Sequence, residues 1–195
     1  MIKDYFAQSS SVISKLASHE KEIKEIVKKI ISCHQKKGKI LVAGNGGSCS
    51  DAEHFVGELV CTYKSPKRKP ISAISLASLP AAFTAWSNDF GWDTYFERQT
   101  KAHLKRNDLL FLISTGGGDR KKGTSMSLIK AAEYAKKNNC KVVSLIGKSG
   151  GELKKISDIF ILVDNYTTSH IQESHIAILH CICEGLDNSF VNKKF

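Results

Sequence analysis

Five short apolar runs that alternate with helical patterns constrain the fold of this chain most strongly. The runs are predicted to be strands at residues 40–43, 71–76, 109–114, 142–146 and 159–163. Helical patterns occupy residues 51–60, 79–86, 94–103, 125–138, 151–156 and 169–188. Strands that are apolar along nearly their whole length are typical of a parallel sheet covered on both faces. The sequence therefore predicts an α/β fold in which helices flank a central parallel five-stranded sheet.

The beginning of the chain predicts helices. Residues 2–37 carry apolar side chains at helical spacing with a break near Ser18 and His19, which predicts two helices. No proline- or serine-rich linker divides the 195 residues. We therefore expect a single domain, residues 1–195, in which residues 1–37 form an N-terminal helical segment for oligomer packing.

Three features predict a cytoplasmic protein without a membrane segment. Apolar runs such as 109–113 are far shorter than the roughly 20 residues that a membrane span requires. Residues 1–5 lack the basic and apolar parts of a secretory signal. The six cysteines have no paired spacing typical of a zinc ribbon, so we expect reduced, mostly buried thiols.

The formal charge of +10 raises the question of a nucleic-acid partner. Basic clusters at 64–69 and 120–122 lie in predicted loops, and no stacking aromatic residues are interleaved with them. We therefore expect a solvated basic surface and no nucleic-acid partner, with part of the excess charge attracting an anionic metabolite.

Two glycine-bearing loops predict a site for an anionic group. Residues 44–48 (Gly-Asn-Gly-Gly-Ser) follow the predicted strand 40–43 and precede the helical pattern at 51–60. Glycines let the backbone approach a ligand, and the free amides at a helix start attract negative charge. A second loop, residues 114–119, ends the predicted strand 109–114. Because the carboxyl ends of parallel strands share one edge of a sheet, both loops are expected to form one pocket that suits a sugar phosphate.

An imidazole and a carboxylate follow the first loop at helical spacing. His54 and Glu58 are four residues apart, so they share one face of the predicted helix. This arrangement suits a metal ion or proton transfer. A surface His–Glu pair is the structural alternative.

The last predicted helix is rich in side chains that can bind or react. It carries His170, Gln172, His175, His180 and Glu184 among apolar residues. His180 and Glu184 repeat the spacing of four, whereas Gln172 and His180 are about 12 Å apart along a helix axis. A metal ion shared by Gln172 and His180 therefore requires Gln172 to lie at the helix start and lean inward. His175 is expected to be a surface or packing residue and not a ligand.

A polar turn is predicted at residues 87–91, between two helical patterns. Asn88 and Asp89 in this turn are expected either to cap the helix that follows or to hydrogen-bond sugar hydroxyls.

These motifs occur together in one known family. They are residues 44–48 with 51–54, residues 87–91 with Phe96, Arg98 and Gln99, and residues 171–176 with His180. In this order and combination the chain resembles the phosphoheptose (sedoheptulose 7-phosphate) isomerases of the SIS, or sugar isomerase, superfamily. The resemblance implies a homotetramer with sites shared between subunits. It also implies interconversion of sedoheptulose 7-phosphate and D-glycero-D-manno-heptose 7-phosphate, on the way to lipopolysaccharide or capsule heptose.

The resemblance implies roles for particular residues. The implied zinc ligands are His54, Glu58, Gln172 and His180. The candidate substrate contacts are Asn45, Gly46, Gly47, Ser48, Glu58, Asn88, Asp89, Ser114, Thr115, Gly116, Asp119 and Gln172. Glu58 and His180 would be the acid–base pair, because isomerisation through an enediolate requires a base near carbon and a proton donor or cation near oxygen. If zinc binds both groups, however, neither is fully free for proton transfer.

The chain departs from the family pattern in two places. The second loop lacks two of the family's hydroxyl donors and is several residues longer. Asp119 in this loop would repel phosphate. The basic run 120–122 would replace the lost hydrogen bonds by charge, and Thr124 or Ser125 would return a hydroxyl at the next helix start. The second departure is His170, which stands where the family commonly has arginine.

Two other functions stay open at this level. The altered second loop favours an isomerase of another phosphosugar. A non-catalytic SIS module that binds a phosphosugar or a protein is the other alternative, which the presence of His54, Glu58 and His180 disfavours.

Overall fold

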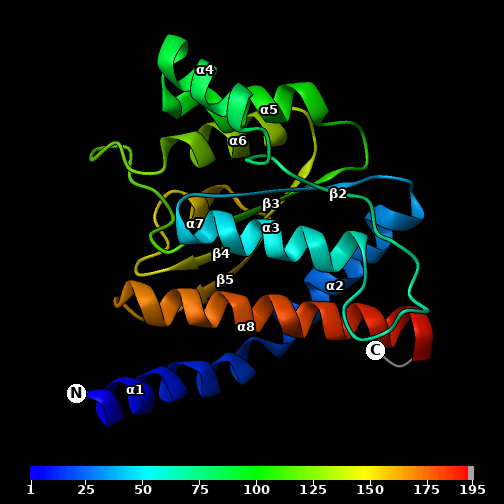
Figure 1. Ribbon diagram of the computed structural model, residues 1–195, viewed down its shortest axis with the longest axis vertical. Coiled ribbons are helices and arrows are strands. Elements are labelled where there is room, and N and C mark those ends of the chain that lie inside the picture. Colours follow the sequence, from blue (N-terminus) through cyan, green and yellow to red (C-terminus); the bar gives the residue numbers. More distant parts are fainter. Residues whose placement is uncertain (193–195) are drawn as a thin grey trace.

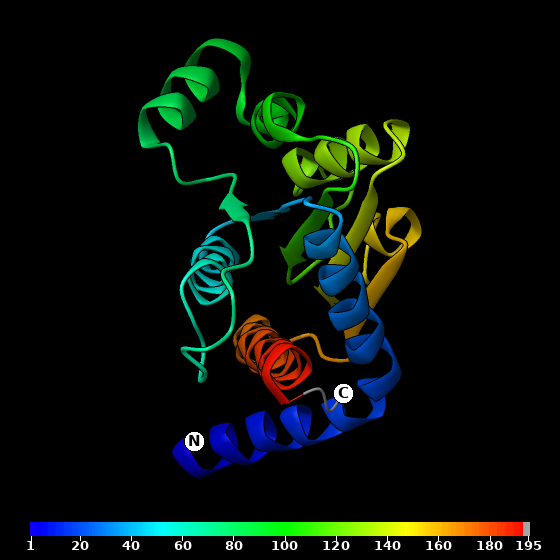
Figure 2. The same ribbon diagram turned by 90° about the vertical axis from the view of Figure 1, so that its right-hand side faces the viewer.

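The computed structural model describes residues 1–192, and at its centre is a five-stranded, all-parallel sheet (Figures 1 and 2). The strands are β1 (Ile40–Gly44), β2 (Ala73–Ser75), β3 (Leu109–Ser114), β4 (Lys141–Gly147) and β5 (Ile159–Val163). They are ordered β2-β1-β3-β4-β5 across the sheet. The predicted α/β fold with a central parallel sheet is confirmed.

Helices cover both faces of the sheet. They are α1 (Ile2–Ser14), α2 (Glu20–Gln35), α3 (Gly47–Val60), α4 (Pro80–Phe90), α5 (Tyr95–His103), α6 (Met126–Lys137), α7 (Leu153–Ile156) and α8 (Thr168–Asp187), with the short turns η1 (Lys15–His19), η2 (Trp92–Thr94) and η3 (Asn188–Asn192). One core joins α2, α3 and α8 to the sheet, and a second core joins α5, α6 and α7 to its other face. Within residues 1–192, no helix is both long and apolar enough to cross a membrane.

The alternation of side chains along each central strand explains the apolar runs. Ile40 and Val42 point into the first core, whereas Leu41 and Ala43 point into the second. All five residues of β1 are buried. A strand that is covered on both faces has no solvent-exposed side, so every position favours an apolar residue.

The N-terminal segment forms two helices that meet at η1, where the break was predicted. Helix α1 packs against α8 and forms an outer layer below it (Figure 2). Its outer face exposes large apolar side chains, among them Ile2 and Phe6, each 66% exposed. This face is available to a partner surface.

The predicted turn at residues 87–91 is wrong. Ser87 to Phe90 belong to the last turn of α4, and Gly91 ends the helix with a φ of 84°. Its amide donates to the Ser87 carbonyl oxygen at 3.2 Å. Only glycine adopts this left-handed backbone at little energetic cost, so the helix runs up to the glycine and stops there.

Candidate active site

The bend between β1 and α3 depends on glycines. Gly46 precedes the first helical residue and has a φ of 57°. A Cβ atom on Gly44 would lie 2.2 Å from the Ser48 carbonyl oxygen, and one on Gly47 would lie 2.3 Å from Gln172 Nε2. The missing side chain at Gly47 therefore lets α8 bring Gln172 against the first turn of α3.

Asp51, one turn into α3, is a buried carboxylate that hydrogen-bonds the Gln172 side chain. Within residues 1–192 its Oδ2 atom has no hydrogen-bond partner. Burial raises the pKa of Asp51 to about 6, although the Gln172 hydrogen bond and the nearby His54 lower it. Asp51 was not among the predicted site residues. Its position three residues before His54, on the same helix face, is the sequence signal that identifies it.

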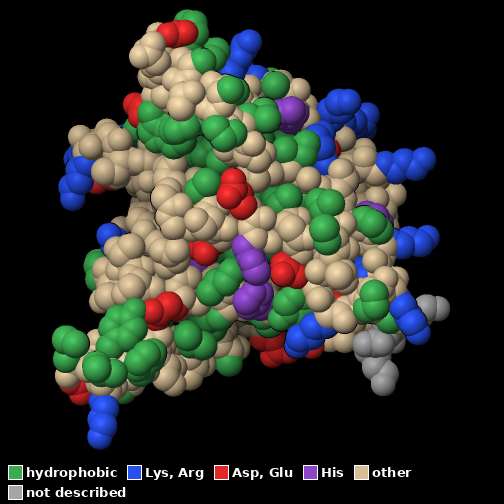
Figure 3. All heavy atoms as spheres, viewed as in Figure 1, with side chains coloured by type: hydrophobic (Ala, Val, Ile, Leu, Met, Phe, Trp, Pro, Cys, Tyr) green, Lys and Arg blue, Asp and Glu red, His purple; other side chains and the backbone are tan. Residues whose placement is uncertain are grey.

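His54, Glu58 and His180 meet where α3 packs beside α8. The Nε2 atoms of His54 and His180 are 3.0 Å apart, and His54 Nε2 lies 3.5 Å from Glu58 Oε1. The Tyr63 ring stacks on the His180 ring, with centroids 5.7 Å apart. The side chain of His54 is 45% exposed and that of Glu58 is 21% exposed. Figure 3 shows histidine side chains at the surface between the two helices, so a ligand can reach this cluster.

The cluster has the donor types that zinc prefers. Zinc binds imidazole nitrogen at about 2.0–2.1 Å in a tetrahedron, which places two ligand atoms about 3.3 Å apart. The two distances from His54 Nε2, 3.0 Å to His180 and 3.5 Å to Glu58, bracket this value. As they stand, no three or more histidine, cysteine, aspartate or glutamate side chains of residues 1–192 form a metal-holding group. The residues therefore fit zinc in donor type and in the two distances from His54, although they do not form a complete metal-binding group as they stand.

The structure does not place Gln172 directly in this cluster. Its amide lies at Gly47 and Asp51, near the start of α3. The predicted contact of Gln172 with zinc therefore stays a prediction, and its place beside the glycine bend suits a substrate contact equally well.

The second glycine-bearing loop lies beside the first. The Asn45 side-chain amide donates to Ser127 Oγ at 3.4 Å, which joins the glycine bend to the first turn of α6. At the end of β3, Ser114 Oγ accepts a hydrogen bond from the Gly117 amide at 3.0 Å. Ser125 precedes α6 and its side chain makes no capping hydrogen bond. Two helix starts and several hydroxyl groups thus share the carboxyl edge of the sheet, an arrangement that attracts an anion.

The extra residues of the second loop form an ordered hairpin. The backbones of Asp119 and Thr124 exchange two hydrogen bonds of 3.0 Å each. The Asp119 Oδ1 atom accepts the amides of Lys121 at 2.8 Å and Lys122 at 3.2 Å. The Asp119 carboxylate is therefore occupied inside the hairpin, whereas the side chains of Lys121 and Lys122 are exposed.

Arg120, which was expected to help bind phosphate by its charge, is engaged in ion pairs with two acidic residues. Its guanidinium pairs with Glu133 on α6 and lies 3.5 Å from Glu152 before α7. Both carboxylates raise the pKa of Arg120, the hydrogen-bonded Glu133 most strongly. Arg120 thus fastens the hairpin to its neighbours, and only Lys121 and Lys122 of the basic run are left to meet a ligand.

Among the described residues, the side chains of Asn88 and Asp89 make no hydrogen bond to either glycine-bearing loop. They are exposed on α4, where the Asn88 amide donates to Asp89 Oδ1 at 2.9 Å. Neither caps the helix that follows, because both belong to the helix that precedes it. Their predicted contact with substrate stays a prediction.

The remaining predicted contacts lie within the loops. Ser48 is buried in the first turn of α3, and Thr115 and Gly116 are half-buried after β3. Two histidines of α8 are buried instead of facing the loops. His175 is fully buried, as a packing residue should be, and His170 packs edge-on against the Tyr5 ring of α1.

A buried ion pair, which the sequence analysis did not identify, holds the ends of α3 and α8 together. Arg68 Nε donates to Asp187 Oδ1 at 2.7 Å, and the two side chains are 1% and 8% exposed. Arg68 also donates to the Glu58 carbonyl oxygen, and Asp187 Oδ2 accepts the backbone amides of residues 64–65. This latch fixes the loop that carries Tyr63 against the histidine cluster.

Comparison with known proteins identifies the family of this chain. The model of the SIS domain family matches residues 4–147. The chain is similar to the phosphoheptose isomerase of Helicobacter pylori (strain P12), with 39% identity over 98% of this chain and 96% of the relative.

Two solved structures have the same fold over nearly their whole length. The phosphoheptose isomerase GmhA from Neisseria gonorrhoeae superimposes with a TM-score of 0.87 at 29% identity, covering 96% of this chain and 97% of that one. A phosphoheptose isomerase from Francisella tularensis gives a TM-score of 0.88 at 34% identity, covering 96% of each chain.

Proposed function

The chain belongs to the SIS domain family and, within it, to the phosphoheptose isomerases, and on this basis we propose that it interconverts sedoheptulose 7-phosphate and D-glycero-D-manno-heptose 7-phosphate. The observation that carries the proposal is the meeting of His54, Glu58 and His180 at the surface between α3 and α8. The protein is an aldose–ketose isomerase of a phosphorylated seven-carbon sugar. Its product serves heptose synthesis for lipopolysaccharide or capsule.

The phosphate is bound where the two glycine-bearing loops meet. The N-termini of α3 and α6 supply the positive ends of two helix dipoles, and Ser125 supplies a hydroxyl group. Lys121 and Lys122 add charge from the hairpin, in place of the hydroxyl donors that the loop lacks. The sugar chain then extends along α3 and α8 towards the histidine cluster.

The reaction moves a proton between neighbouring carbons of the open-chain sugar. Glu58, whose side chain is 21% exposed, removes a proton from the carbon beside the carbonyl group and then gives a proton to the former carbonyl carbon. His180 donates a proton to the carbonyl oxygen as the enediol forms and takes a proton from the neighbouring hydroxyl group as the new carbonyl group forms; its ring is held by Tyr63 and His54. Each of these roles contributes roughly 10²- to 10⁴-fold in rate.

Zinc is the metal that these residues suit. His54, Glu58 and His180 would hold it, with Gln172 as a further candidate, and a zinc ion that binds Glu58 and His180 would compete with their acid–base roles. When bound, zinc would act as a Lewis acid for the oxygens of the enediolate. Asp51 orients the Gln172 amide in either case, since the two side chains are hydrogen-bonded.

The active form is a homotetramer in the cytoplasm. The exposed apolar faces support assembly, because α1 exposes Ile2 and Phe6 and the α4 region exposes Leu79 and Phe90. Six free cysteines agree with a reducing compartment.

The experiment is an NMR assay of sedoheptulose 7-phosphate conversion, with and without a metal chelator. Glu58→Gln and His180→Ala should each remain folded and lose at least about 99% of turnover, because each removes one acid–base group. Glu53→Gln is the matched control, since Glu53 is an exposed acid on the same helix. Near-normal rates in either active-site variant would contradict the assignment. A wild-type protein that converts another phosphosugar and not this one would favour the alternative that the hairpin suggests.

A further inference from the structure

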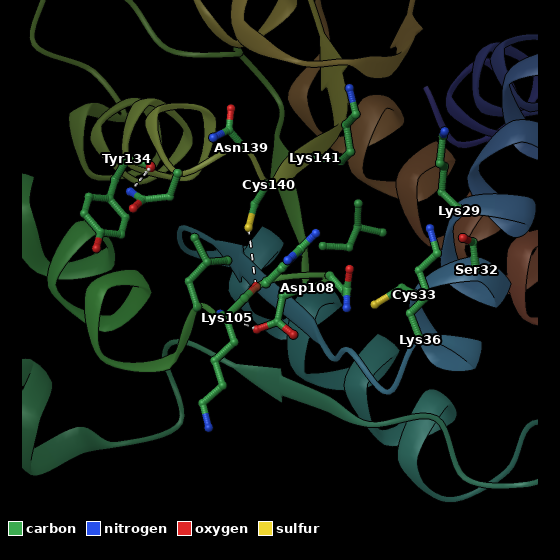
Figure 4. A pocket seen from close by; sticks show the side chains of 15 residues that line it. Lys29, Ser32, Cys33, Lys36, Lys105, Asp108, Tyr134, Asn139, Cys140 and Lys141 are labelled. Carbon is green, nitrogen blue, oxygen red and sulfur yellow. Dashed lines mark hydrogen bonds between the residues drawn. The ribbon is translucent and has the colours of Figure 1, made fainter.

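A second cavity lies at the opposite edge of the sheet from the glycine-bearing loops. It has a volume of about 690 Å³ and lies at the amino ends of β3 and β4 (Figure 4). Figure 4 shows Lys29 and Lys36 rising from α2 on one side, and Asn139 and Cys140 on the other. Small-molecule sites have volumes of about 300–1,000 Å³, so this cavity is large enough for a metabolite.

The walls of the cavity carry an excess of positive charge. Its basic residues are Lys29, Lys36, Lys105, Arg106 and Lys141, and its one acidic residue is Asp108. The Asp108 carboxylate is buried and accepts the Lys39 amide at 2.9 Å, the Lys39 ammonium at 2.5 Å and the Lys105 amide at 2.7 Å. The acid is therefore neutralised inside the protein and does not offset the charge of the cavity.

Most of the cations have no protein partner among residues 1–192. Lys141 pairs with Asp158 outside the cavity, at 2.8 Å. Within the described part of the chain, the side chains of Lys29, Lys36 and Lys105 make no ion pair or hydrogen bond, and the same holds for Arg106. Lys29 is half-buried.

Helix ends explain only part of this charge. The C-terminus of a helix attracts cations, but the effect falls off within its last turn. Lys36 caps α2 and fits this explanation. Lys29 lies further back in α2, and Lys105 and Arg106 lie in the turn after α5, outside any helix. These three cations line one cavity from two separate walls, Lys29 half-buried and Lys105 and Arg106 exposed.

We propose that this cavity binds a small metabolite that carries at least two phosphate groups, at a site distinct from the isomerase centre. Cations from α2 and from the 104–109 turn would each meet one anionic group through charge-assisted hydrogen bonds. The amides of Asn107 and Asn139 line the space between and would bind the rest of the ligand.

The cysteines of this chain give a local test. Cys33 and Cys140 line the cavity and are each 6% exposed, whereas Cys183 is 1% exposed and lies outside it. Burial raises the pKa of Cys33 to about 11, with Asp108 adding to the effect, so this thiol reacts slowly and its alkylation can be followed. Pulsed alkylation with iodoacetamide, read by mass spectrometry, reports each cysteine separately.

Pyrophosphate at constant ionic strength is the probe. At about ten times its Kd it should slow alkylation of Cys33 and Cys140 about tenfold and leave Cys183 unchanged. Orthophosphate should protect the same two cysteines much more weakly. Equal slowing of Cys183 would show general stabilisation, such as phosphate binding at the isomerase centre, and would overturn the proposal. So would an absence of protection, or equal protection by orthophosphate.

Matched variants test the cations. Lys29→Ala and Arg106→Ala should each weaken the protection by pyrophosphate about tenfold, because each removes a charge-assisted hydrogen bond. Lys28→Ala is the control, since Lys28 is the exposed neighbour of Lys29 on α2 and does not line the cavity. The proposal fails if pyrophosphate protects Cys33 and Cys140 equally well in all three variants. Isomerase turnover should be unchanged in all of them, which separates this site from the proposed function.

Discussion

The latch between Arg68 and Asp187 gives the sharpest prediction about stability. Asp187→Ala leaves a guanidinium that is 1% exposed without its carboxylate, and it removes the acceptor of the amides at residues 64–65. Breaking a buried ion pair in this way costs about 3–5 kcal/mol. That is a large fraction of the roughly 5–15 kcal/mol by which native domains are stable. Urea unfolding at a fixed protein concentration measures the loss.

The chain contains a matched control for this prediction. Lys64 and Glu184 join the same loop to the same helix, but their side chains are 63% and 47% exposed. Glu184→Ala should therefore lower the free energy of unfolding by less than about 1 kcal/mol. The double variant Arg68→Met/Asp187→Leu should recover part of the loss, since no charge is then left buried without a partner. Equal losses for Asp187→Ala and Glu184→Ala would refute the reasoning.

Two further predictions concern the candidate active site. Replacing Lys121 and Lys122 together by alanine should raise KM for sedoheptulose 7-phosphate about tenfold with kcat little changed. An unchanged KM would show that both lysines are solvated surface residues that do not contact the phosphate. Asp51→Asn should stabilise the metal-free protein above pH 6 by up to about 3 kcal/mol. The pKa of Asp51 is about 6 in the folded protein and 3.8 ordinarily, so ionisation of Asp51 destabilises the fold as the pH rises from 3.8 to 6. The gain should vanish below about pH 4, and a gain independent of pH in urea titrations would contradict this origin.

The fold was predictable because its signal is local. Each of the five strands was predicted at its observed place within about two residues, since strands buried on both faces must be apolar throughout. The end of α4 was missed because Ser87, Asn88 and Asp89 are common in turns, and only the backbone of Gly91 decides where the helix stops.

The candidate site was predictable only in part. His54 and Glu58 share a helix face at a spacing visible in the sequence, and their meeting with His180 followed from the resemblance to a known family. The Arg68–Asp187 pair joins residues 119 positions apart, and nothing local distinguishes Arg68 from the other basic residues around it. The ion pairs of Arg120 were not predictable for the same reason, because its acidic partners come from other elements.

The central claim is that a carboxylate and imidazoles of α3 and α8 move a proton between two carbons of a heptose phosphate. Isomerisation of sedoheptulose 7-phosphate in D₂O, followed by NMR, tests it most directly. Proton transfer by a side chain exchanges with solvent, so the aldose product should carry deuterium at C2 in the wild-type protein, and Glu58→Gln should form almost no product. Product formed at full rate without deuterium, or full activity of Glu58→Gln, would contradict the account.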